Sequence, residues 1–237
     1  KLLSETPAPR LGPEVVLDLV DPRVIQCVSA CQLDAIALAT RAAREGSGFI
    51  LADATGSGKG RTAMGNALNH CLSTDCRLVI YVSVTNVYPD VGRDYNVFKP
   101  LFSSLKMPLK HVRDGVATKG VLFVPYSYLK KTTQKDLLAR CGHCALILDE
   151  SHSATKLSGT TASMRAKVAH AMGLEVHASP RSSVLFASAT WASGISDLQL
   201  YAETLQLVGE GNPFQSWHTL NGLLGGTRAS YGFLEMV

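Results

Sequence analysis

The chain has 237 residues, of which 46% are hydrophobic and 18% are charged, and its formal net charge is +4. This composition is typical of a folded domain, and no apolar run approaches the roughly 18 to 20 residues of a membrane-spanning helix, so we expect no membrane partner. The small positive excess permits a polyanionic partner without identifying one.

The first segment of the chain is rich in proline. Four prolines fall within residues 1–23, which predicts an irregular N-terminal arm over 1–23. The sequence SACQ at 29–32 fits a capping box, so we expect a helix from there to about Arg44. Gln32 also has a second interpretation, as a glutamine that contacts an adenine ring ahead of a phosphate-binding loop, and the sequence leaves both roles open.

Residues 48–61 read GFILADATGSGKGR, an apolar segment followed by a glycine-rich loop, a lysine and a helical pattern. The apolar residues 49–52 suit a strand that is buried on both faces. Glycines let backbone N–H groups turn around an anion, Lys59 can reach the outer phosphates of a nucleotide, and the following helix directs its N-terminus at them. The pattern predicts a P-loop; a glycine turn that merely joins strand and helix is the alternative.

The predicted loop departs from the usual P-loop pattern at one position. Gly60 stands where that pattern ends in Ser or Thr, so the hydroxyl that normally ligates Mg²⁺ is missing. Thr62 is a poor substitute, because two helical residues turn a side chain roughly 200° away. The residues expected to bind the nucleotide phosphates are Thr55, Gly56, Ser57, Gly58, Lys59, Gly60 and Arg61.

Four further apolar segments, rich in β-branched and aromatic residues, predict buried strands at 78–84, 121–126, 145–148 and 184–187. Helical patterns separate or follow them at about 87–98, 130–139, 161–172 and 195–208. This alternation predicts an α/β fold, with a mostly parallel central sheet and helices on both faces. Functional groups are then expected where the strands end.

The strand predicted at 145–148 ends in two acids and a histidine, within the sequence DESH. We expect Asp149 to hold a Mg²⁺ ion through water, together with phosphate oxygens, and Glu150 to orient and deprotonate an attacking water. The alternative is an exposed turn after a core strand. His152 completes the catalytic candidates.

The next predicted strand ends in Ser188, Ala189 and Thr190. Small hydroxyl side chains there can hydrogen-bond the region of Asp149 and His152, so we expect this segment to couple nucleotide state to a bound strand of nucleic acid. The tripeptide alone indicates no function, and this interpretation depends on its position after the acidic strand.

The order of these motifs resembles the first RecA-like lobe of superfamily 2, DExD/H-type helicases. Within that group the chain resembles the strawberry notch family, whose phosphate loop also reads GKGR, here at 58–61. The sequences SVTN at 83–86, PYSYL at 125–129 and GEGNPF at 209–214 agree with this family. Departures from its pattern are found at Ala52, Ala54, Ser151 and Trp191.

The resemblance implies a RecA-like P-loop NTPase lobe over 24–214, with ATP and Mg²⁺ as cofactors. It also implies a nucleic-acid surface that includes Ser83, Thr85, Asn86, Tyr126 and Ser127. A second RecA-like lobe in the same full-length protein would supply arginines for catalysis, so the isolated chain should be nearly inactive. We expect residues 215–237 to begin the linker towards that lobe.

Three functions compete at this point. The first is the ATP-binding lobe of an ATPase that depends on a nucleic acid, either RNA or DNA. The second is a weak or inactive lobe that serves as a scaffold in a large protein or ribonucleoprotein complex. A small P-loop kinase is the third, and the motif order argues against it.

Six cysteines without regular spacing, including a C-x-x-C at 141–144 that we expect to be buried, suggest an intracellular protein. The family resemblance favours the nucleus, with an organelle as the alternative.

Overall fold

The computed structural model describes residues 12–53, 56–115, 117–155, 157, 163–190, 195–209 and 215–223. In this part of the chain a six-stranded sheet forms the centre of the fold, with every neighbouring pair parallel. Its strand order is β1-β6-β5-β2-β4-β3, so the predicted α/β fold with a parallel sheet is confirmed. The strands are β1 (Phe49–Leu51), β2 (Leu78–Ser83), β3 (Leu109–His111), β4 (Gly120–Pro125), β5 (Ala145–Asp149) and β6 (Ser183–Ala187).

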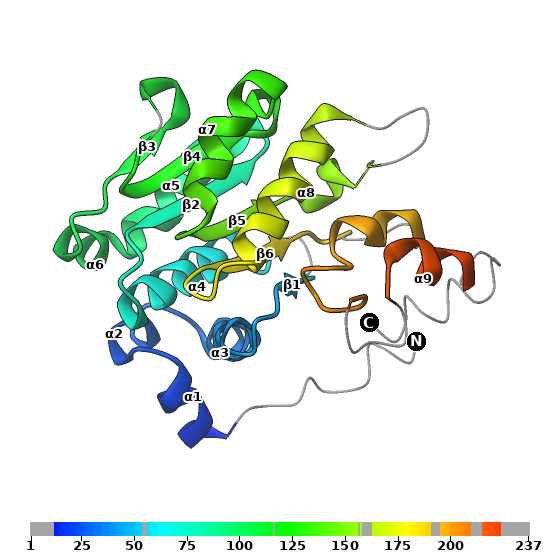
Figure 1. The fold of residues 1–237 in the computed structure, drawn as a ribbon. Helices are drawn as coiled ribbons and strands as arrows, with labels where there is room; N and C mark the ends of the chain where they lie inside the picture. Colours follow the sequence, from blue (N-terminus) through cyan, green and yellow to red (C-terminus); the bar gives the residue numbers. More distant parts are fainter. Residues whose placement is uncertain are drawn as a thin grey trace.

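Helices cover both faces of the sheet (Figure 1). One face packs against α3 (Ala30–Arg44), α4 (Lys59–Ser73), α5 (Tyr88–Val97) and α6 (Lys99–Ser104), and α1 (Pro13–Leu19) and α2 (Pro22–Ile25) extend this layer. The other face packs against α7 (Lys131–Cys141) and α8 (Met164–His177). A last helix, α9 (Trp217–Leu223), lies against the turns that follow β6. Two apolar cores result, one on each face of the sheet.

Two expectations about single elements are wrong. Helix α1 and the start of α2 lie within the segment expected to be irregular. Both helices begin with a proline, which the first turn of a helix accepts because its N–H groups have no helical partner. The helix expected at 195–208 is a short 3₁₀ helix, Ile195–Leu200, followed by turns. Gln206 has a left-handed backbone (φ 56°), which interrupts a right-handed helix. The sequence also did not predict β3 and α6.

Helix α4, which follows the predicted loop, is buried on almost every side. The pattern predicted one apolar stripe, but polar residues of this helix are buried as well, among them Asn69. Its side-chain amide donates to the Leu19 carbonyl and to Thr40 Oγ1, both at 2.9 Å, and its oxygen accepts from the backbone N–H of Asp21 at 2.8 Å. These bonds tie α4 to three neighbouring segments.

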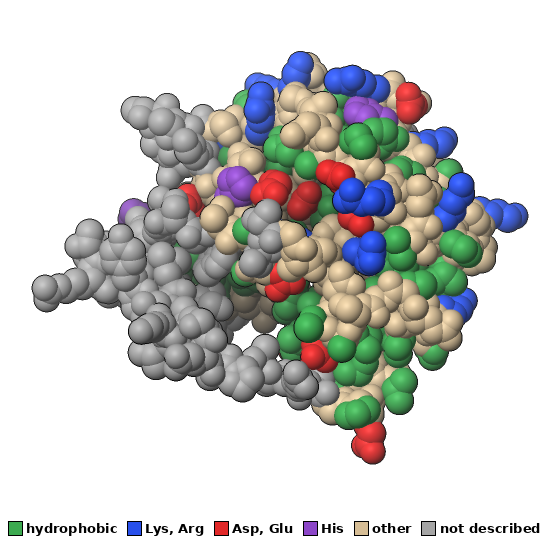
Figure 2. Space-filling view, turned by 180° about the vertical axis from the view of Figure 1, so that it is seen from behind, with side chains coloured by type: hydrophobic (Ala, Val, Ile, Leu, Met, Phe, Trp, Pro, Cys, Tyr) green, Lys and Arg blue, Asp and Glu red, His purple; other side chains and the backbone are tan. Residues whose placement is uncertain are grey.

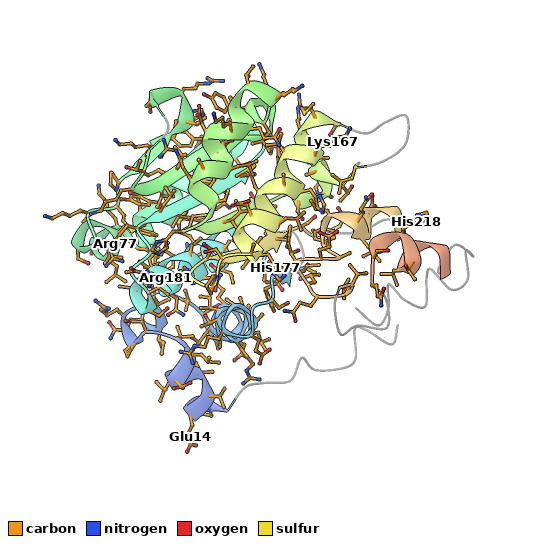
Figure 3. The ribbon with its side chains drawn as sticks, in the orientation of Figure 1. Glu14, Arg77, Lys167, His177, Arg181 and His218 are labelled. Atoms are coloured by element: carbon orange, nitrogen blue, oxygen red, sulfur yellow. The ribbon has the colours of Figure 1, made fainter. Side chains whose placement is uncertain are left out.

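The two ends of the sheet have different characters. Figure 3 labels Arg77, His177 and Arg181, which precede β2 or β6 and therefore lie at the amino ends of the strands. The cysteines of the C-x-x-C, Cys141 and Cys144, are also found at this end and are buried free thiols, as expected. Among the described residues, no helix has the length and apolar character needed to cross a membrane.

Candidate nucleotide-binding site

The loop after β1 has the backbone of a phosphate-binding loop. Gly56 and Gly58 adopt left-handed conformations, with φ of 85° and 86°, which glycine adopts without strain. Gly58 is the residue before α4, so the first-turn N–H groups of that helix lack carbonyl partners within it and favour an anion. Lys59 Nζ donates to the backbone carbonyl of Asp53 at 2.9 Å. Thr55, also predicted here, lies outside the described residues.

Gln32 contacts the loop and caps its own helix at the same time. Its Oε1 accepts the backbone N–H of Ser29 at 3.1 Å, which is the capping role. Its Nε2 donates to the carbonyl of Gly58 at 3.3 Å, and a Cβ on Gly58 would overlap this amide nitrogen. Gln32 therefore supports the shape of the phosphate loop; contact with an adenine ring stays a prediction.

A pocket of about 850 Å³ brings the predicted motifs together. Its lining combines residues 56–61 of the loop, the end of β5, part of α5 and the segment 26–29 with Gln32. Both acidic and basic side chains line it: Asp90, Asp94, Asp149 and Glu150, and Lys59, Arg61 and Arg93. Figure 2 shows acidic and basic side chains gathered near the middle of one face of the molecule. Such a mixture suits a charged ligand that brings both phosphates and a cation.

Asp149, the last residue of β5, is held by a buried hydroxyl. Ser83 Oγ, at the end of the neighbouring strand β2, donates to Asp149 Oδ2 at 2.7 Å. Burial raises the pKa of the Asp149 carboxyl, against the opposing effect of its hydrogen bonds from Ser83 and Tyr81. The Ser83 hydroxyl therefore orients the carboxylate, but the hydrogen bonds offset only part of the cost of burying its negative charge. A nearby cation would offset the rest.

Glu150 and His152 are connected to the end of β6. The Glu150 backbone is left-handed (φ 49°, ψ 44°), a costly conformation for a residue with a side chain, as is often found at functional sites. His152 Nδ1 lies 2.9 Å from Ser188 Oγ and 3.3 Å from Glu150 Oε2. Ser188 Oγ also accepts the backbone N–H of Thr190 at 3.2 Å. The predicted contact between the DESH and SAT segments is thus present, through Ser188, while Ala189 and Thr190 are exposed.

Gly60 lies in the first turn of α4, and its neighbourhood was not predicted. A Cβ built on Gly60 would overlap Asp94 Oδ2 and would lie 3.7 Å from the hydroxyl oxygen of Tyr81. Burial raises the pKa of Asp94, an effect that the nearby Arg93 and Arg61 oppose. Thr62, expected to be a poor substitute for the missing hydroxyl, is buried, and its Oγ1 donates to the carbonyl of Gly58 at 3.3 Å. The family resemblance includes the pair Arg93-Asp94, but no role for Asp94 was predicted from the sequence.

The predicted nucleic-acid residues divide into two groups. Ser83 and Tyr126 are buried, at 0% and 3% exposure, so they do not lie on the surface in this conformation of the chain, and their contact with nucleic acid stays a prediction. Thr85, Asn86 and Ser127 are exposed after β2 and β4, and the hydroxyl oxygens of Thr85 and Ser127 are 3.5 Å apart. Polar residues at strand ends look alike in a sequence, and only packing distinguishes the two groups.

The donor set of the pocket fits a nucleotide with Mg²⁺. Mg²⁺ prefers oxygen ligands, retains waters and is usually bound through one or two carboxylates with substrate phosphates. Asp149 and Asp94 supply carboxylates, and no group of three or more His, Cys, Asp or Glu side chains in the described part of the chain is arranged to hold a metal ion alone. Arg61 Nε is buried without a hydrogen-bond partner among the described residues, which suits an anion.

Together, the parallel α/β sheet, the P-loop geometry and the acidic strand end define a RecA-like P-loop NTPase lobe. The family model described as P-loop containing NTP hydrolase pore-1 matches residues 5–237, and the chain belongs to this family. The expected relation to strawberry notch proteins is confirmed. The chain is 32% identical over 217 residues to human protein strawberry notch homolog 1 and 27% identical over 235 residues to mouse protein strawberry notch homolog 2.

These matches cover most of this chain but only a small part of each relative. The alignments cover 80% and 91% of this chain but 15% and 17% of the human and mouse relatives. A solved structure, the Sulfolobus solfataricus SWI2/SNF2 ATPase core in complex with dsDNA, superposes with a TM-score of 0.59 at 13% identity, covering 91% of this chain and 41% of that one. This likeness supports the RecA-like fold. Trp191 and residues 210–214, which the sequence comparison singled out, lie outside the described residues.

Proposed function

We propose that the chain is the ATP-binding lobe of a nucleic-acid-dependent ATPase of the strawberry notch type. The observation that carries the proposal is one pocket that joins the phosphate loop to the acidic end of β5. A phosphate loop alone would bind an anion, and an acidic strand end alone would be an exposed turn. Their presence in one pocket is what phosphoryl transfer requires, since charge stabilisation and water activation must act on the same phosphate.

Each side chain of the pocket has a distinct task in this proposal. Lys59 neutralises charge on the outer phosphates, alongside backbone N–H groups of the loop. Asp149, oriented by Ser83, would hold Mg²⁺ through water; when bound, the ion neutralises developing charge on the phosphates. Glu150 orients the attacking water and accepts its proton. His152 connects Glu150 to Ser188 and so carries the state of the site to the end of β6.

Nucleic acid would bind at the same edge of the sheet, over the exposed loops after β2 and β4. Thr85, Asn86 and Ser127 present hydroxyl and amide groups there, which are suited to phosphate and sugar contacts. A second RecA-like lobe of the longer protein would close over the pocket and supply arginines, which contribute on the order of 10³ to 10⁵ in rate in comparable sites. Larger protein or ribonucleoprotein assemblies would then form around the complete motor.

Calorimetry with ADP and with an ATP analogue tests the binding part of this proposal. Lys59→Ala should weaken binding at least tenfold, a loss of about 1.4 kcal/mol. Lys167→Ala is the matched control, because Lys167 is an exposed lysine on α8, on the other face of the sheet (Figure 3). Equal affinities of Lys59→Ala and the parent chain would contradict the proposed site.

Measuring the rate of ATP hydrolysis tests the catalytic part of the proposed function. In the longer protein, Glu150→Gln should retain nucleotide binding and lose hydrolysis, because an amide still hydrogen-bonds water but cannot accept its proton. The isolated chain should hydrolyse ATP barely above background, with or without RNA or DNA. A longer protein that is equally inactive, and that Glu150→Gln does not change, would favour a scaffold role over a motor.

A further inference from the structure

The space beside Gly60 is filled by a carboxylate. In an ordinary P-loop the residue after the lysine carries a hydroxyl that ligates Mg²⁺. Here a Cβ at Gly60 would overlap Asp94 Oδ2, so the absence of a side chain at 60 makes room for the Asp94 carboxylate from α5. An oxygen therefore lies close to the place of the missing hydroxyl, but it comes from a different element and carries a negative charge.

Asp94 is held in this place by the packing of its helix. Its neighbours Val91 and Tyr95 on α5 are buried, and the Tyr95 hydroxyl donates to the carbonyl of Met107 at 3.0 Å. The Asp94 carboxylate itself is half-buried and has no hydrogen bond to any described residue, and its opposing charges, Arg61 and Arg93, form no ion pair with it. A positioned carboxylate without a hydrogen-bond donor, beside a phosphate loop, indicates a ligand that brings the donor.

We propose that Asp94 replaces the missing P-loop hydroxyl and, together with Asp149, accepts hydrogen bonds from the water shell of nucleotide-bound Mg²⁺. This inference rests on the proposed function and names a further residue of the same site. A missing hydroxyl alone would weaken the link between Mg²⁺ and nucleotide, whereas a second carboxylate repels phosphates in the absence of the ion and attracts the ion in its presence.

The test is the affinity of the chain for ADP by calorimetry, in EDTA and in saturating Mg²⁺. Asp94→Asn should reduce the affinity gain that Mg²⁺ produces by roughly tenfold, the lower end of effects seen for outer-shell partners of metal sites. In EDTA the same variant should bind ADP as tightly as the parent or more tightly, because a repulsive charge is gone. A merely structural role would weaken binding in both conditions.

Asp90→Asn is the matched control, because Asp90 also lines the pocket from α5 but pairs with Arg93 at 2.9 Å and does not contact Gly60. It should leave the Mg²⁺ effect close to the parent value. An equal loss in both variants would overturn the inference, since general electrostatics would then explain it. An unchanged Mg²⁺ effect in Asp94→Asn would overturn the inference alone, while a parent chain that binds no ADP in either condition would overturn the proposed function as well.

An exchange variant gives a second, independent measurement. Gly60→Thr alone should disrupt the loop, because the new side chain overlaps Asp94. Gly60→Thr combined with Asp94→Ala removes the overlap and restores an ordinary P-loop hydroxyl. The double variant should therefore recover a Mg²⁺ effect that Asp94→Ala lacks. If Asp94→Ala and the double variant respond to Mg²⁺ alike, the carboxylate does not stand in for the hydroxyl.

Discussion

The hydrogen bond from Ser83 to Asp149 offers a quantitative test of the site, because Ser83 is buried, Asp149 is partly buried and the bond is short, at 2.7 Å. Hydrogen bonds to charged groups contribute about 1.5 to 3 kcal/mol to stability. For a domain of this size each kcal/mol shifts the melting temperature by about 2 to 4 °C, so Ser83→Ala should lower it by roughly 3 to 12 °C.

The loss should depend on pH in a defined direction. Burial raises the pKa of Asp149, and the Ser83 hydroxyl opposes this by stabilising the ionised carboxylate. Without Ser83 the pKa of the Asp149 carboxyl rises further. The variant therefore loses most stability at pH values where the carboxylate of the parent chain is ionised. The destabilisation should therefore be full at neutral pH and should diminish as the pH falls through the raised pKa of Asp149.

Thermal unfolding of the purified chain at several pH values measures this effect. Ser151→Ala is the control, because Ser151 is equally buried and its hydroxyl lies 3.0 Å from that of Tyr201, in a neutral pair. Its loss should be about 0.5 to 1.5 kcal/mol and should not follow the titration of Asp149. Ser83→Ala should also reduce the Mg²⁺-dependent gain in ADP affinity. A pH-independent loss in Ser83→Ala, equal to that of Ser151→Ala, would refute the reasoning.

Two further predictions concern the charge and backbone of the pocket. Asp149→Asn should raise the melting temperature of the nucleotide-free chain near neutral pH, since a carboxyl with a raised pKa loses stability as the pH rises through that pKa; an unchanged or lower value would contradict this. Gly58→Ala should weaken ADP binding at least tenfold, because φ is 86° and the new Cβ overlaps Gln32. Gly142→Ala, at a position with φ of −65° and open space around it, should bind ADP like the parent.

The sheet could be predicted because five of its strands are continuous apolar segments between turn signals. Strands buried on both faces, such as β2 and β4, leave that pattern in any sequence. The exception, β3, has three residues at the edge of the sheet and a half-exposed side-chain pattern, so no periodicity marks it. The prediction of a helix at 195–208 was wrong for the opposite reason. This segment has buried residues at the spacing of one helical face, although a short 3₁₀ helix and turns bury them.

The motif residues of the site could be predicted because local geometry determines them. A glycine loop before a helix, and acids at the end of a buried strand, meet wherever a parallel sheet forms. Asp94 depends instead on how α5 packs against α4, and Ser83 on which strand lies beside β5. Neither relation is encoded in spacing along the chain, so no role was predicted for Asp94, and Ser83 was expected on a nucleic-acid surface instead of beside Asp149.

The two pocket carboxylates also connect folding to ligand binding. Burial raises the pKa of both Asp94 and Asp149, which means that their ionised forms cost stability in the nucleotide-free chain. A bound Mg²⁺ nucleotide would offset this cost as part of its binding free energy, and the whole stabilisation would be about 2.7 kcal/mol when its concentration is 100 times its dissociation constant. The charges that prepare the site for its cation are thus the same charges that make the empty lobe less stable.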